Sequence, residues 1–182
     1  MRLVLLALVS AFAVACSPAE EAEQMSEGCD ARGVSQWAAG ADTFSVEAST
    51  AGPDCARAVA TLVVRNSSGE PIYAEAHVAD DVMTLREMSD AAAMNAALAE
   101  WVAPNEMMNS TGALPEWASN ADAPSAGEFP FYPDEGHTRE SYAALRAANY
   151  PMFCYVQGRE SLSCITYGDG GIERIGVQTF PG

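Results

Sequence analysis

The chain has 182 residues and a formal net charge of −16, and all nine of its basic residues are arginines. Because phosphate binding needs clustered cations, this composition argues against nucleic acid and anionic lipid headgroups as partners. We interpret the acidic balance as a solubility feature rather than as a surface built for a basic partner.

The first residues, MRLVLLALVSAFAVAC, have the pattern of a secretory leader. Arg2 provides a positive start, and the apolar run from Leu3 to Ala13 is shorter than the roughly 20 residues that a membrane-spanning helix needs. The segment Ala13-Val14-Ala15-Cys16 resembles the lipobox of bacterial lipoproteins, and the resemblance covers the leader alone. An ordinary secretory peptide cut after Ala15 is the alternative.

The lipobox resemblance implies that cleavage leaves Cys16 as an acylated N-terminus, and Ser17 behind it implies the periplasmic face of the outer membrane. Two or more acyl chains anchor a protein stably, so the chain is expected to be tethered to the membrane rather than to span it. We predict a signal peptide over 1–15, a flexible acidic tether over 16–28 and a single globular domain over 29–182.

Apart from Cys16 there are four cysteines, and an even number in an oxidising compartment indicates two disulfides with three possible connectivities. Local pairing is favoured, because a hairpin turn centred on Arg159 places Cys154 opposite Cys164. That leaves Cys29 to pair with Cys55. No Cys-x-x-Cys spacing occurs, so neither a thioredoxin-type site nor a zinc knuckle is supported.

The N-terminal half is expected to be a β-meander. Strict alternation predicts a half-buried strand over Thr43–Thr50, whereas Asp30–Ala41 is ambiguous. A hairpin with Gly69 in its turn is predicted to place Val64 opposite Ile72, with the even-numbered residues of both strands buried.

A long helix is predicted next, with Thr84 and Glu87 as a capping box and Pro104 as the stop. Residues 105–136 contain four prolines and little periodicity, and this long loop is expected to lie on the body of the protein. A short helix over Thr138–Asn149 follows, with Tyr142 and Leu145 directed inward.

Three strands are predicted at the C-terminus, over Met152–Gln157, Leu162–Tyr167 and Ile172–Phe180. The predicted fold is therefore α+β, with about six antiparallel strands in one or two sheets, one long helix, one short helix and two disulfides. In each C-terminal strand, alternate side chains point to opposite faces of the sheet, and one face should be polar if it meets water. On that face the side chains are instead mostly aromatic or aliphatic. This candidate binding face carries Phe153, Tyr155, Ile165 and Tyr167, and either the 105–136 loop or the second helix covers it, or it binds a peptide, glycan or protein.

No catalytic motif stands out. His77 and His137 are the only histidines, and each is interpreted as incidental, with His77 on a solvent-facing side of its strand. Met107 and Met108 faintly resemble the methionine-rich segments of periplasmic copper proteins, although methionines also fill core gaps. No catalytic residue, metal site or cofactor is predicted.

The sequence therefore favours a non-enzymatic binding or interaction module of the cell envelope, held at the membrane by Cys16, with an envelope protein, peptide or glycan as partner. A small periplasmic hydrolase with its site under the 105–136 loop is the first alternative, and copper handling is the second.

Overall fold

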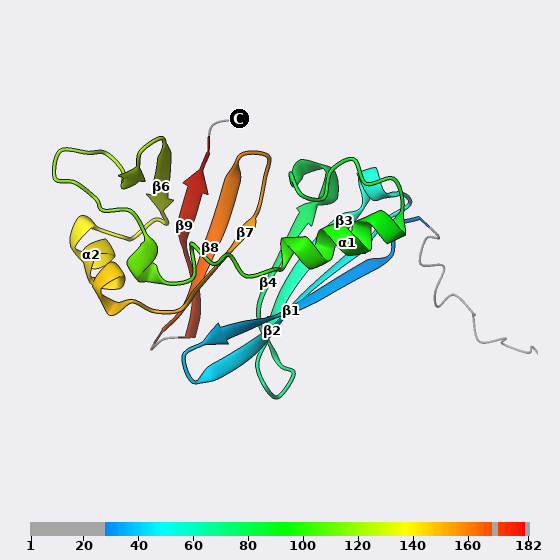
Figure 1. The fold of residues 1–182 in the computed structure, drawn as a ribbon, viewed down its shortest axis with the longest axis horizontal. Coiled ribbons are helices and arrows are strands. Elements are labelled where there is room, and N and C mark those ends of the chain that lie inside the picture. Colours follow the sequence, from blue (N-terminus) through cyan, green and yellow to red (C-terminus); the bar gives the residue numbers. More distant parts are fainter. Residues whose placement is uncertain (1–27, 169–170, 181–182) are drawn as a thin grey trace, which may run out of the picture.

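The computed structural model describes residues 28–168 and 171–180. The leader, the predicted lipidation site Cys16 and most of the predicted tether therefore lie outside the described residues. The described part contains two antiparallel sheets, two α-helices and two disulfides, and it is mostly β structure. It has nine strands rather than about six. Figure 1 shows the two sheets side by side, with α1 over the N-terminal sheet and α2 beyond the C-terminal sheet.

The N-terminal sheet has four strands in the order β1-β2-β3-β4. Their bounds are Ala31–Ala39 for β1, Asp42–Ala51 for β2, Val59–Arg65 for β3 and Pro71–Val78 for β4. The alternation predicted for β2 is confirmed, because Phe44, Val46 and Ala48 are buried. The ambiguous segment before it forms β1, which pairs with β2 along its whole length.

The register of the β3–β4 hairpin differs from the prediction. Val64 pairs with Tyr73 and Arg65 pairs with Pro71, so Ile72 is an extra residue in β4. Because side chains alternate with a period of two, this bulge moves every later residue of β4 to the opposite face. The odd-numbered residues Tyr73, Glu75 and His77 therefore face the interior, and the predicted burial of the even-numbered ones is wrong.

The helix α1 spans Ala91–Trp101, and the predicted capping box at Thr84 is wrong. Its cap is Asp90, whose side chain accepts the backbone N–H of Ala93 at 2.9 Å. Thr84 lies in an irregular turn, where Glu87 has a positive φ of 61°. A side chain at Gly33 of β1 would meet the backbone of α1, so this glycine allows the helix and strand to approach closely.

The C-terminal sheet has five strands in the order β5-β6-β9-β8-β7. Their bounds are Ser125–Ala126 for β5, Phe129–Pro133 for β6, Met152–Val156 for β7, Ser161–Gly168 for β8 and Gly171–Thr179 for β9. The three predicted C-terminal strands are confirmed. The segment 105–136, however, is not an irregular cover, because β6 inserts into the sheet beside β9.

The helix α2 spans Arg139–Ala148 and begins as predicted. Thr138 accepts the backbone N–H of Ser141, and the Ser141 side chain in turn accepts the backbone N–H of Thr138. Tyr142 and Leu145 are buried, as expected. The two helices have 11 and 10 residues, so the predicted contrast between a long and a short helix is not observed.

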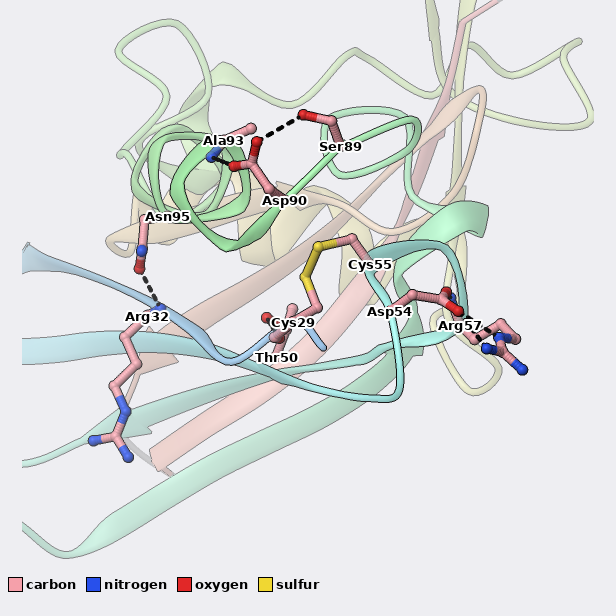
Figure 2. The surroundings of a disulfide bond; sticks show 10 residues. All are labelled: Cys29, Arg32, Thr50, Asp54, Cys55, Arg57, Ser89, Asp90, Ala93 and Asn95. Atoms are coloured by element: carbon pink, nitrogen blue, oxygen red, sulfur yellow. Dashed lines mark hydrogen bonds and ion pairs between the residues drawn. A yellow bond between two sulfur atoms is a disulfide. The ribbon is translucent and has the colours of Figure 1, made fainter. Parts of the chain in front are cut away.

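Both disulfides have the expected local pairing. Cys29 is bonded to Cys55 and ties the start of β1 to a short 3-10 helix over Cys55–Arg57 (Figure 2). Cys154 is bonded to Cys164, its direct cross-strand neighbour in the β7–β8 pair. All four cysteines are buried.

Candidate functional site

The predicted binding face lies in the core of the protein. Its four residues are enclosed to different degrees. Phe153, Tyr155 and Ile165 are fully buried and Tyr167 is half-buried. They belong to one cluster with the inward-facing residues of the N-terminal sheet. These four residues are therefore not an open platform.

The cover of this face is the N-terminal sheet together with α1, rather than the 105–136 loop or the second helix. The ring of Trp37 lies 5.8 Å from that of Phe153, and the ring of Phe44 lies 4.8 Å from that of Tyr167. The indole N–H of Trp101 donates to the carbonyl of Val156 at 2.6 Å. The aromatic side chains on this face of the C-terminal strands therefore pack one sheet on the other.

A chain of hydrogen bonds crosses the seam between the two sheets. The Tyr155 hydroxyl donates to Tyr73, and the Tyr73 hydroxyl donates to a carboxylate oxygen of Glu75, each at 2.9 Å. Burial raises the pKa of Tyr73, so its phenol stays neutral. The predicted binding face therefore contacts the odd-numbered side chains of β4 through hydrogen bonds as well as through aromatic contacts.

His77 lies in the same seam, and the prediction of a solvent-facing imidazole is wrong. Its ring lies 5.8 Å from that of Trp101 and 6.0 Å from that of Tyr155. Burial lowers the pKa of His77, and the nearby Glu75 carboxylate opposes that effect. Within the described part of the chain, Nε2 of His77 is buried and has no hydrogen-bond partner.

The two histidines and the Met107–Met108 pair do not come together in a metal site. His137 precedes α2, and its backbone N–H donates to the carbonyl of Asp134. Met107 is 83% exposed, whereas Met108 packs on the C-terminal core. Across residues 28–168 and 171–180, no group of three or more His, Cys, Asp or Glu residues could hold a metal ion.

The segment proposed to cover a hydrolase site is held in place by Arg139. Its guanidinium lies 4.8 Å from the centre of the Trp117 ring and donates to the carbonyls of Trp117, Ala118 and Ala121. The Tyr142 hydroxyl donates to the carbonyl of Pro115 at 2.9 Å. These contacts fix the segment against α2.

The exposed face of the N-terminal sheet carries an open groove of about 530 Å³, which we call the outer groove. Its lining residues are Arg32, Gly33, Val34, Glu47, Ala48, Ser49, Val63 and Arg65. Val34 is 63% exposed, and Arg65 donates to Glu47 at 2.9 Å. The outer groove therefore combines apolar strand surface with charged side chains.

Arg32 is the least engaged cation of the described chain. Its backbone N–H donates to Asn95 of α1, while its side chain points away from the helix (Figure 2). A neighbouring hollow of about 330 Å³ shares Arg32 and Ser49 with the outer groove. Arg32 thus stands where two depressions of one surface meet.

The other described arginines have structural partners. Five form ion pairs: Arg57, Arg65, Arg86, Arg159 and Arg174. Two donate to backbone carbonyls: Arg139 and Arg146. Arg32 is the one arginine among residues 28–168 and 171–180 whose guanidinium has neither kind of contact. The sequence could not single it out, because each partner is supplied by the fold.

The inner face of the C-terminal sheet is covered over β7, β8 and the start of β9, where Ile172 packs on the core, whereas Tyr132 of β6 is 51% exposed. Tyr132, Val177 and Ser163 lie in one cross-strand row with the buried Tyr155. Towards β6 this row opens into a shallow groove of about 460 Å³, which we call the seam groove. It is lined by Tyr132, Pro133, Asp134, Glu135, Arg174 and Val177.

The comparisons with known proteins place the chain in no family. No family model, no curated protein and no solved structure matches it. No helix within the described residues is long and apolar enough to cross a membrane.

Proposed function

We propose that this protein is a non-enzymatic binding module of the cell envelope, anchored through acylated Cys16 at the periplasmic face of the outer membrane. Its contact surface is the outer groove. Its partner is an envelope protein that presents an extended, carboxylate-bearing segment. The lipobox resemblance supports the anchor and location, and the groove geometry supports the mode of contact.

The single observation that carries the binding proposal is the free guanidinium of Arg32. Guanidinium groups have a planar fork of N–H donors that matches a carboxylate. Arg32 shares its two depressions with Glu47 and Asp30 but forms no ion pair with either, and Glu47 is paired with Arg65, so in a chain of net charge −16 this exposed guanidinium is available for an external anion. Charges farther apart than about 8 Å are largely screened at physiological salt, so the local cation decides the contact more than the net charge does.

The apolar part of the groove favours an extended segment. Val34 and Val63 flank Glu47 on neighbouring strands, and all three face outward. Side chains of an extended peptide alternate between two sides with a period of two. A segment with apolar and acidic residues at every second position would present both kinds of side chain from one side, and would contact the valines and Arg32 together.

The direct test is an NMR titration of the protein with a short, capped peptide whose odd positions alternate between valine and glutamate and whose even positions are serine. We expect shifts at Arg32, Val34 and Val63. Arg32→Gln should weaken binding about tenfold or more, because a charge-assisted hydrogen bond contributes about 1.5–3 kcal/mol. Arg57→Gln is the matched control, since Arg57 is exposed, pairs with Asp54 and lies outside the groove.

A second peptide with lysine in place of glutamate tests the charge requirement. Equal affinity for the two peptides, or an Arg32→Gln variant that binds like the unaltered protein, would overturn the proposal. In cells, a photo-crosslinker at Val34 should give a product that disappears with Arg32→Gln. The same crosslinker at Met83, exposed but outside the groove, should not give that product.

A further inference from the structure

The seam groove is chemically unlike the outer groove. We infer that it is a binding site for a neutral saccharide, independent of the partner proposed for the outer groove. Three features carry the inference: an exposed aromatic ring, a locked ion pair beside it, and a backbone arrangement that holds both on one face.

The aromatic ring belongs to Tyr132 of β6. It is 51% exposed, although its backbone is held by pairing with Val177 of β9. A tyrosine presents an apolar ring surface together with a polar hydroxyl, and such rings contribute strongly to binding at low entropic cost. The C–H-rich face of a pyranose ring is an apolar surface of matching size.

The ion pair joins Arg174 of β9 to Asp134, directly after β6. Nε and a terminal nitrogen of Arg174 donate to the two carboxylate oxygens at 2.8 and 3.0 Å. A guanidinium has five N–H donors and a carboxylate has about four acceptor positions, so both groups keep unused capacity. Their side chains are 41% and 26% exposed, which leaves that capacity within reach of a ligand.

This pairing limits which ligand groups Arg174 and Asp134 can bind, while Glu135 in the same lining disfavours an anion. Because each charge is already neutralised by the other, the pair is a poor site for a free anion or cation. It instead presents a donor and an acceptor side by side. Adjacent hydroxyl groups of a sugar can accept from one and donate to the other, and Tyr132 stands beside them.

The backbone places these groups together. In the β8–β9 pair, Cys164 faces Gly176 and Ile165 faces Arg174, so Ile175 is an extra residue. Bulges of this kind re-aim side chains, and here the bulge puts Arg174 on the same face as Val177. Gly176 has a φ of 149°, and a side chain there would meet the carbonyl of Tyr132. The close approach of β6 to β9 thus requires this glycine.

The size and openness of the groove fit a short saccharide. Its volume of about 460 Å³ lies within the range of small-molecule sites. Because it is shallow, we expect weak binding, with a dissociation constant on the order of 1 mM.

The test is an NMR titration of the protein with cellotriose and with chitotriose, both neutral trisaccharides. We expect at least one of them to shift the signals of Tyr132, Arg174 and Val177. Tyr132→Ala should weaken that binding about five- to tenfold, while Tyr132→Phe, which keeps the ring, should bind within about twofold of the unaltered protein. Phe129→Ala is the matched control, because Phe129 is a half-exposed ring of the same strand outside the groove.

Asp134→Asn tests the ion pair, and it should weaken saccharide binding while circular dichroism shows an intact fold. Arg32→Gln should leave saccharide binding unchanged, so failure here and failure of the outer-groove proposal can be told apart. No shift with either sugar at tens of millimolar would overturn the inference. Stronger binding of spermidine or of a uronic acid trisaccharide at the same residues would also overturn it, since the ligand would then be charged.

Discussion

The phenol oxygens of Tyr73 and Tyr155 lie 2.9 Å apart and join β4 of one sheet to β7 of the other. Tyr73 also donates to Glu75, so a single hydroxyl is both the acceptor across the seam and the donor within β4. Two strands more than seventy residues apart are thus connected through one partly buried chain of hydrogen bonds.

Tyr73→Phe should therefore destabilise the protein. The change removes both hydrogen bonds and leaves the Tyr155 hydroxyl without its acceptor, which costs about 1–2 kcal/mol of unfolding free energy. Urea denaturation followed by circular dichroism measures the difference. Tyr132→Phe removes an exposed hydroxyl and should change the unfolding free energy by less than about 0.5 kcal/mol. Equal effects of the two changes would show that the seam hydrogen bonds add no stability.

The stability of the protein should fall in mild acid because of His77. Burial lowers its pKa in the folded state, so the unfolded chain binds the proton more readily. The His77 contribution is complete above the ordinary histidine pKa of about 6.5, and it is lost as the pH falls below that value. His77→Gln should flatten the dependence of the unfolding free energy between about pH 7 and pH 5. His137→Asn is the comparison at a histidine outside the seam, and a slope unchanged by His77→Gln would contradict the assignment.

The start of α1 can be located by mutation. Asp90→Ala removes the side chain that accepts the backbone N–H of Ala93, and we expect a loss of about 1 kcal/mol. Thr84→Val should be neutral or stabilising, because the Thr84 hydroxyl is buried without a hydrogen-bond partner in the described chain. Thermal unfolding of the two variants measures this. A larger loss for Thr84→Val than for Asp90→Ala would restore Thr84 as the cap.

The anchoring proposal has its own test in Cys16. Expressed with its leader in a bacterium, the protein should carry acyl chains on Cys16 and partition into the detergent phase of a Triton X-114 separation. Cys16→Ser should release the protein or leave the precursor uncleaved, and mass spectrometry distinguishes these two products. Cys29→Ser is the control, because Cys29 is bonded to Cys55 and should not affect acylation. An unaltered protein found wholly in the aqueous phase would refute lipidation.

The features that could be predicted from sequence are those decided within a few residues. The strand β2 follows from strict alternation, and the start of α2 follows from Thr138 as its cap. The Cys154–Cys164 bond follows from the short turn between two strands, which leaves little freedom in their pairing. Local propensity and the two-residue period are sufficient for such elements.

The features that were predicted wrongly from the sequence depend on one extra residue in a strand or on contacts with distant segments. The bulge at Ile72 inverted β4 and brought His77 inside, although no residue there signals a bulge. The strand β6 forms only because β9 offers it an edge, and its proline-rich sequence looks like a loop. The sequence shows that the aromatic side chains of the C-terminal strands need a cover, but nothing local indicates that the other sheet provides it.

The sequence by itself determined the leader motif, the acidic balance, most strand positions and the local disulfides, because each depends on composition or on near neighbours. Only the tertiary structure decided which polar groups are engaged. Arg32 is distinguished from the other described arginines because its guanidinium forms neither an ion pair nor a hydrogen bond to a backbone carbonyl. Tyr132 is distinguished from the other tyrosines because it lies where the sheet-on-sheet contact ends. Both properties arise from packing between segments far apart in the chain, which the pattern of residues along the chain does not encode locally.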